Sequence, residues 1–106
     1  MSPTSEVAYH LLTMNIIRVQ KWLHDMAPNE DYLIDMLIVE GLAPRRLTLA
    51  PGEVTAAQAV PYDRILFVLN GSMTFGFQVD DEPTHLRAGD RLEIPAATLH
   101  NAVVGS

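Results

Sequence analysis

The chain contains no cysteine in its 106 residues, which excludes disulfides, thiolate metal sites and cysteine nucleophiles. It is also poor in basic residues, with 7 Lys and Arg against 13 Asp and Glu, and its formal net charge is −6. Nucleic-acid-binding proteins normally carry a basic patch, so we expect no nucleic-acid partner. Arg45 and Arg46 are adjacent, but they form a pair rather than a patch.

Long hydrophobic runs are missing as well. The longest nearly apolar stretch, residues 33–39, is interrupted by Asp35 and is too short to cross a membrane. The N-terminus lacks the basic-then-apolar order of a signal peptide. We therefore expect a cytoplasmic protein without a membrane partner.

The rest of the composition is typical of one folded domain. Hydrophobic residues make up 48% and charged residues 19%, a combination typical of a folded globular chain, because disordered chains are less hydrophobic and more highly charged. A chain of this length is large enough for one core and too short for two. We expect an N-terminal leader at residues 1–14, with Met14 as an alternative start, and a single domain at 15–106 whose barrel core spans 45–104.

The N-terminal part of this domain predicts one strand and one helix. Residues 15–23 favour a strand, with Trp22 packed on the domain or on a partner. Asn29 can cap a helix, and two acidic residues follow it where the helix dipole favours negative charge. We expect the helix body at 32–40, ended by Gly41. Its apolar positions cover most of the circumference, which indicates packing into an interface or against a sheet.

From residue 45 onward the sequence predicts short strands separated by turn residues. Asn70-Gly71 is a strong signal for a type I′ hairpin, because that turn needs positive φ at both central residues. An acidic turn is expected at 80–83. The predicted strands are 45–50, 54–60, 64–69, 72–78, 84–87, 91–94 and 99–104. Their spacing favours a small barrel or a sandwich.

The segment from residue 88 to residue 100 is the most informative part of the chain. Ala88-Gly89-Asp90 predicts a tight turn, in which the aspartate bonds back to its own main chain. Residues 91–94 alternate polar and apolar side chains, which is typical of a strand with one buried face. Pro95 ends that strand because it has no N–H to donate. A loop of small residues then leads to His100 at the start of the next strand.

This arrangement resembles the second motif of the cupin family: a glycine, five residues, a proline, and a loop ending in a metal-binding histidine. The family's later asparagine falls on Val104. The first cupin motif begins and ends with glycines, which align here with Gly52 and Gly71. The resemblance covers roughly residues 47–104 and implies an all-β, cupin-type double-stranded β-helix, a jelly-roll barrel, with one short N-terminal α-helix.

The metal ligands of the first cupin motif are replaced in this chain. Its two histidine positions fall on Gln58 and Val60, and its glutamate position falls on Arg64 or, with a longer spacer, on the next residue. Valine cannot bind metal, and glutamine is a poor ligand compared with imidazole. A fixed charge at Arg64 repels divalent cations and attracts carboxylate or phosphate. We expect no tightly bound cofactor and at most a weak divalent metal on three donors: His100, Gln58 and Asp63.

Within the implied barrel, the resemblance places a ligand pocket around His100. Met73, Phe75 and Phe77 alternate along one strand and share a face, either as ordinary core or as an apolar wall for a ligand. His100 is either a ligand-binding residue or a half-buried histidine bonded to its surroundings, and Asp63 faces either the barrel mouth or solvent. The expected pocket residues are Gln58, Val60, Arg64, Phe67, Met73, Phe75, Phe77 and His100.

The leading functional interpretation is a small-molecule-binding or regulatory barrel with an eroded metal site. The sequence shows no Ser/His/Asp set, no phosphate loop and no carboxylate pair at a catalytic spacing, so no catalytic residue is assigned and enzyme activity is not favoured. A small carboxylate or another small molecule is the expected ligand. One alternative is a metal-dependent enzyme of the dioxygenase or isomerase type that uses His100 with non-histidine ligands.

A dimeric interaction module is the other alternative, and we expect a homodimer in any case. The chain ends at Ser106, soon after the predicted strand that contains His100, where the family's barrel runs on. An open sheet edge invites association, and the apolar segment 16–23 is free to cover it in its own chain or across a two-fold axis.

Overall fold

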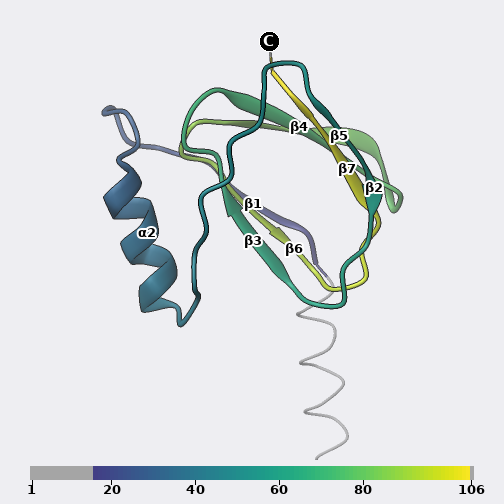
Figure 1. Cartoon of the computed structure of the whole chain (residues 1–106), viewed down its shortest axis with the longest axis horizontal. Coiled ribbons are helices and arrows are strands. Elements are labelled where there is room, and N and C mark those ends of the chain that lie inside the picture. The colour runs from purple at the N-terminus through teal and green to yellow at the C-terminus, as the bar shows by residue number, and fades with distance from the viewer. Residues whose placement is uncertain (1–15, 106) are drawn as a thin grey trace, which may run out of the picture.

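A computed structural model describes residues 16–105 of the chain. The predicted leader and the alternative start at Met14 lie outside the described residues. This part of the chain forms seven strands and one helix (Figure 1). The elements are β1 (Arg18–Gln20), α2 (Glu30–Val39), β2 (Val54–Gln58), β3 (Arg64–Phe67), β4 (Ser72–Phe77), β5 (Asp80–Arg87), β6 (Arg91–Ile94) and β7 (His100–Val104).

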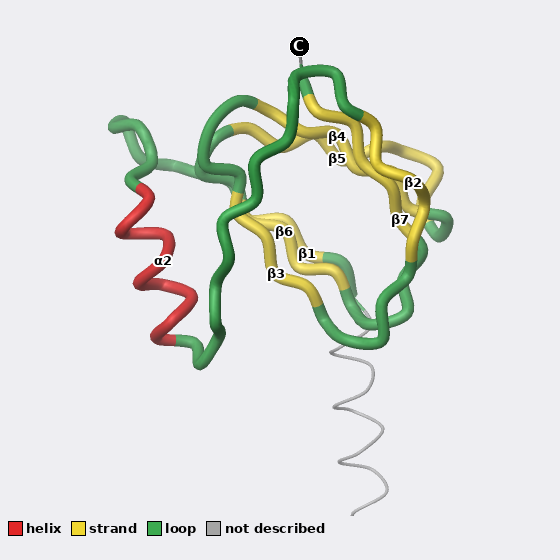
Figure 2. Tube along the Cα trace, in the orientation of Figure 1, coloured by secondary structure: helices red, strands yellow, loops and turns green. Residues whose placement is uncertain are grey.

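The strands form two antiparallel sheets that face each other (Figures 1 and 2). One sheet has the order β1-β6-β3 and the other has the order β2-β7-β4-β5. The mostly β fold with a single helix is therefore confirmed. Barrel closure is wrong for the described residues, because no strand of one sheet pairs with a strand of the other.

The hydrophobic core lies between the two sheets. Leu92 and Ile94 on β6 belong to the same buried cluster as Phe75 and Phe77 on β4. Successive side chains of a strand point to opposite faces, so these alternate residues mark the inner face of each sheet. Among residues 16–105, the buried cluster consists of Val68, Phe75, Phe77, Leu86, Leu92, Ile94 and Ala102.

Local capping signals set the bounds of α2. The Asn29 side chain accepts hydrogen bonds from the N–H groups of Asp31 (2.8 Å) and Tyr32 (3.3 Å), as an N-cap does. Gly41 follows the last turn with φ +82°, a conformation that side chains disfavour. The predicted helix is confirmed. It stands beside the three-stranded sheet, and only Leu33 of its ten residues is buried (Figure 1). No helix within residues 16–105 is long and apolar enough to cross a membrane.

The predicted strand at 45–50 is wrong. This segment runs without regular structure from the end of α2 to the turn at Pro51 and Gly52 (Figure 2). Leu47, one of its alternating apolar residues, is 73% exposed. A strand needs a neighbour to satisfy its backbone, and none of the described strands pairs with this segment.

The predicted hairpin at Asn70-Gly71 is also wrong. β3 and β4, which flank it, belong to different sheets, so the chain crosses from one sheet to the other at this point. Gly71 has φ +78°, but Asn70 has no positive φ, and a type I′ turn needs both. The crossing is fixed before the bend, where Val68 exchanges backbone hydrogen bonds with Gly89 (2.6 Å) and Asp90 (3.1 Å).

The hairpin that does form joins β4 to β5 and turns at Gln78 and Val79. Phe77 pairs with Asp80, so the acidic residues 80–83 begin β5 and do not make the turn predicted for them. β5 lies at the edge of its sheet and pairs only with β4. An edge strand tolerates a proline such as Pro83, because its open side has no neighbouring strand to receive an N–H.

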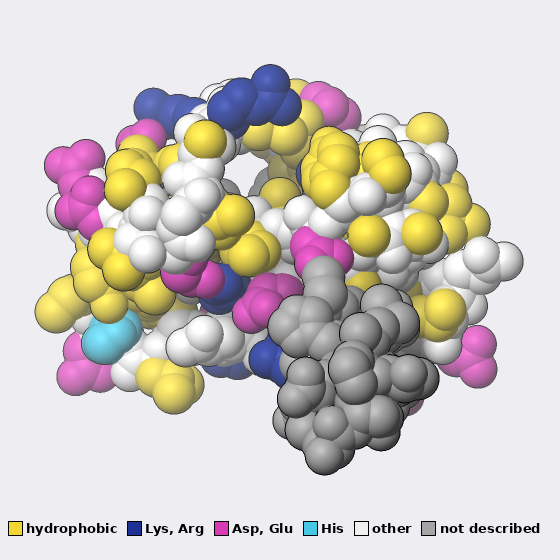
Figure 3. Space-filling view, turned by 90° about the horizontal axis from the view of Figure 1, so that it is seen from below, with side chains coloured by type: hydrophobic (Ala, Val, Ile, Leu, Met, Phe, Trp, Pro, Cys, Tyr) yellow, Lys and Arg dark blue, Asp and Glu magenta, His cyan; other side chains and the backbone are white. Residues whose placement is uncertain are grey.

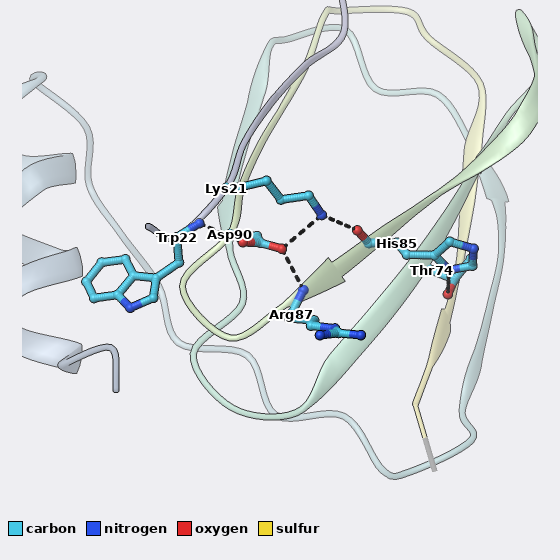
Figure 4. Close-up of polar contacts among 6 residues, drawn as sticks. All are labelled: Lys21, Trp22, Thr74, His85, Arg87 and Asp90. Atoms are coloured by element: carbon cyan, nitrogen blue, oxygen red, sulfur yellow. Dashed lines mark hydrogen bonds and ion pairs between the residues drawn. The ribbon is translucent and has the colours of Figure 1, made fainter. Parts of the chain in front are cut away.

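The glycine turn before β6 is confirmed and also fixes the N-terminal segment. Gly89 has φ +91°, and Trp22 packs directly on it. The buried carboxylate of Asp90 accepts hydrogen bonds from the N–H groups of Arg87 (2.8 Å) and Trp22 (2.8 Å) and from Lys21 Nζ (3.1 Å) (Figure 4). Trp22 therefore packs on its own domain, and Asp90 joins the backbone at Arg87 to the backbone at Trp22 and to the Lys21 side chain.

Candidate functional site

An arginine–histidine pair lies at one end of the inner faces of the two sheets. Arg64 begins β3, and its Nη1 lies 2.7 Å from Nε2 of His100, which begins β7. His100 is 3% exposed, and its Nδ1 lies 2.8 Å from the carbonyl oxygen of Thr98. A guanidinium can only donate, so Nε2 is the acceptor and Nδ1 carries the proton that is donated to Thr98.

Other predicted pocket residues surround the His100 ring. The rings of Phe75 and Phe77 lie 6.4 and 6.2 Å from it, centroid to centroid, and both are buried in the core. Gln58 pairs with His100 in the β2–β7 register, so the two side chains share a face, with Gln58 exposed. Met73 packs against the core from its margin. The structure thus brings three predicted residues into contact with His100, namely Arg64, Phe75 and Phe77, whereas Gln58 is its register partner and remains exposed.

Phe67 lies on the opposite face of its sheet. It pairs with Arg91 in the β3–β6 register, whereas Arg64 pairs with the inward-facing Ile94. The Arg91 guanidinium carbon lies 5.4 Å from the centre of the Phe67 ring, a cation–π distance. An interval of three residues along a strand changes the face, so this difference was readable from the sequence.

Two predicted site residues in the segment between β2 and β3 accept hydrogen bonds from the loop that leads to His100. The Asp63 Oδ1 accepts a hydrogen bond from the N–H of Ala96 (2.8 Å), and the Val60 carbonyl accepts one from the N–H of Ala97 (2.7 Å). Ala97 has φ +63°, the only positive φ at a non-glycine residue in the described part of the chain. Asp63 and Val60 therefore hold the loop that orients His100.

Two surface hollows lie on either side of the Arg64–His100 pair. The larger has a volume of about 360 Å³ and is lined by Ala57, Gly76, Phe77, Gln78, Asp81, Pro83, Leu99, His100 and Asn101. The smaller has a volume of about 190 Å³ and is lined by Ile16, Arg18, Asp63, Arg64, Ile65, Glu93, Ile94 and Pro95. Arg64 therefore lines one hollow while hydrogen-bonding to a histidine that lines the other.

The smaller hollow holds two arginines that lack an ion-pair partner within residues 16–105, namely Arg18 and Arg64. The two carboxylates of this hollow have other partners. Asp63 accepts from Ala96, and Glu93 accepts from Nε of Arg91 (3.3 Å). The hollow thus holds two guanidinium groups and two carboxylates, and Glu93 lies opposite Arg18 in the β1–β6 register. Its capacity for an anion depends on the guanidinium N–H donors that these carboxylates do not bind.

The donor set does not fit the metal that the cupin resemblance implies. No group of three His, Cys, Asp or Glu side chains that could hold a metal occurs in the part of the chain that is described. Both nitrogens of His100 are engaged, and Nε2 would have to lose Arg64 before it could bind a cation. We therefore derive no step through a metal.

A hydroxyl–imidazole contact lies on the outer face of the four-stranded sheet. Oγ1 of Thr74 lies 2.8 Å from Nδ1 of the exposed His85 (Figure 4). Lys21 donates to the backbone carbonyl of His85 (2.7 Å) and does not contact the ring. Within the described residues no carboxylate hydrogen-bonds to this imidazole, so the pair lacks the third member of a catalytic triad.

Arg91 has a role that the sequence did not reveal. It is 6% exposed, and its two terminal nitrogens donate to the two carboxylate oxygens of Glu40, each at 2.6 Å. The hydrogen bonds from Arg91, opposed by partial burial and assisted by its charge, lower the pKa of Glu40. Glu40 lies just after α2 and 51 positions from Arg91, so no local pattern predicts this tie between helix and sheet.

Comparisons with protein-family models, with curated proteins and with solved structures found no match to this chain.

Proposed function

We propose that this chain is a small-molecule-binding module of cupin-like, jelly-roll type that binds a small carboxylate through Arg64, with Arg18 beside it. The cupin assignment is supported by the glycine turn, the short strand and the loop that end at His100. The anion preference is supported by the unpaired guanidinium groups of the smaller hollow.

The observation that carries this proposal is the partner of Arg64. A half-buried arginine normally pairs with a carboxylate, but here one Nη1 donates to a neutral imidazole. An arginine has five N–H donors, so the remaining donors are free to bind a ligand carboxylate in a bidentate arrangement. The hollow of about 190 Å³ is smaller than the pockets of drug-sized ligands, which favours a short carboxylate.

Replacement of Arg64 by glutamine tests this proposal. Hydrogen bonds to charged groups contribute about 1.5–3 kcal/mol, so the affinity for acetate, succinate or a similar anion should fall about tenfold or more. Isothermal titration at low ionic strength measures the change. Arg45→Gln removes an exposed arginine of the loop after α2 and serves as the matched control, with unchanged affinity.

Equal carboxylate affinity in Arg64→Gln and in the unmodified chain would contradict the proposal. Elemental analysis distinguishes the metal-enzyme alternative. A stoichiometric transition metal that is lost in His100→Ala would favour that alternative over carboxylate binding.

A second candidate function is that of a homodimeric interaction module, and the exposed apolar side chains around α2 favour it. Figure 3 shows hydrophobic side chains gathered at the α2 end of the molecule. Those exposed before, in and after α2 are Leu23, Met26, Tyr32, Ile38, Val39, Leu42 and Leu47. β1 belongs to the segment that was expected to cover an open sheet edge, and it pairs with β6 of its own chain. A helix that is apolar on most of its surface is normally covered, and a second copy is the simplest cover.

Light scattering tests the dimer. The unmodified chain should have the mass of two copies, and Val39→Asp should reduce it to one, because a buried charge opposes association. Val39 is 87% exposed in the single chain, so the substitution should leave the fold intact. Val79→Asp, at a 77% exposed position in the β4–β5 turn, is the matched control and should remain dimeric. A monomeric unmodified chain would refute this candidate.

A further inference from the structure

The bend at Asn70-Gly71 does not form a hairpin, and its side chain and backbone are open to solvent. Both residues are exposed, between β3 in one sheet and β4 in the other. Neither the side chain of Asn70 nor the N–H of Gly71 forms a hydrogen bond within the described part of the chain. Nothing lies within 4 Å of the position that a Cβ on Gly71 would occupy.

We propose that Asn70 is a site of spontaneous deamidation in the folded protein. The backbone nitrogen of Gly71 attacks Cγ of Asn70, so an N–Cγ bond forms and the Cγ–Nδ2 bond breaks. The amide group leaves as ammonia and takes the proton of the Gly71 N–H. Water then opens the five-membered succinimide at either carbonyl and gives aspartate or isoaspartate, with one new negative charge.

The other described asparagines lack these conditions and provide an internal comparison. Oδ1 of Asn29 accepts two backbone N–H groups at the start of α2, and the next residue, Glu30, is helical. Asn101 lies within β7, and the N–H of the following Ala102 donates to Oγ1 of Thr55 (2.9 Å). At Asn29 the side-chain amide oxygen is engaged by α2, at Asn101 the attacking nitrogen is hydrogen-bonded, and at both positions the next residue carries a Cβ.

Deamidation of Asn70 should change the structure only near the bend where the chain crosses from β3 to β4. An isoaspartate inserts a methylene into the backbone of the bend, where Val68 on one side and Ser72 on the other are held by backbone hydrogen bonds. Arg64 lies at the other end of β3. Carboxylate binding should therefore be unchanged in the modified form, which makes this inference independent of the proposed function.

Incubation of the folded full-length chain in mildly alkaline buffer tests the inference, with peptide mass spectrometry after digestion. Asn70 should convert about tenfold faster than Asn29 or Asn101, which corresponds to a barrier lower by about 1.4 kcal/mol. The modified chain should separate by ion exchange because of its added charge. Asn70→Gln should abolish the new species, since the longer side chain closes the ring poorly.

Two results would overturn the inference. One is an intact Asn70 amide in the folded chain under conditions where the same bond converts in the urea-unfolded chain. The other is equal conversion at Asn29, Asn70 and Asn101, which would mean that the reaction follows unfolding rather than the native bend.

Discussion

Asp90→Asn should lower the free energy of unfolding by about 3 kcal/mol, because the buried carboxylate binds three donors and leaving such donors unpaired costs roughly 1–3 kcal/mol each. Asparagine retains one acceptor oxygen, but its NH₂ group faces another donor. Urea denaturation measures the loss, and thermal melting should show a midpoint lower by more than about 10 °C. Asp25→Asn, at an exposed loop position, is the matched control and should change stability by less than about 0.5 kcal/mol.

The pH dependence of stability provides an independent test of Asp90. Burial is the largest single influence on this carboxyl and would raise its pKa. The hydrogen bonds from the N–H groups of Arg87 and Trp22, together with the Lys21 ammonium, outweigh it and hold the pKa of Asp90 below the usual 3.8. A lowered folded-state pKa means that the unfolded chain binds the proton more readily.

The stability contributed by Asp90 is therefore complete above the unfolded-state pKa and is lost as the pH falls through the folded-state pKa. Below about pH 5 the unmodified chain should lose stability more steeply than Asp90→Asn. Glu40, whose pKa is also lowered, contributes a slope of the same sign to both proteins and cancels in the difference. Parallel acid profiles for the two proteins would contradict the role assigned to Asp90.

Gly89→Ala should also destabilise the fold by about 3 kcal/mol, since two costs add at this residue. Its φ of +91° is disfavoured for any residue with a Cβ. An added Cβ would also lie 2.6 Å from Cβ and Cδ2 of Trp22, well inside van der Waals contact, so the indole would have to move. Chemical denaturation measures the sum of both costs.

Two variants separate these costs. Gly52→Ala has a similar φ of +77° with nothing within 4 Å of the new Cβ, so it should cost only the backbone term, about 1 kcal/mol. In a Trp22→Gly background, which removes the Trp22 Cβ as well as the indole, Gly89→Ala should cost only the backbone term, which gives a coupling energy of about 2 kcal/mol. Additive effects of Trp22→Gly and Gly89→Ala would show that the Trp22 side chain does not press on this turn.

The candidate site was predictable from the sequence only in part. The alternation of residues on β4 and the position of His100 at the start of β7 placed Phe75, Phe77 and His100 on one inner face. The hydrogen bond between Arg64 and His100 was not predictable, because these residues are 36 positions apart and lie on strands of different sheets. Only the packing of the two sheets decides which inward-facing side chains meet.

The sequence by itself determined the elements whose signals act within a few residues. Asn29 and Gly41 set the ends of α2, and Gly89 and Asp90 set the turn before β6. Each signal depends on hydrogen bonds or φ values within one turn of the chain, so the rest of the molecule cannot easily override it.

Tertiary structure alone decided which strands pair and which segments remain unpaired. Residues 45–50 have the alternation of a strand but no neighbour, and Asn70-Gly71 has the composition of a hairpin but joins two sheets. Arg91 binds Glu40 across 51 positions, which attaches α2 to the three-stranded sheet. The physical reason is that a strand or an ion pair is stabilised by its partner, and the identity of that partner is fixed only when distant parts of the chain pack together.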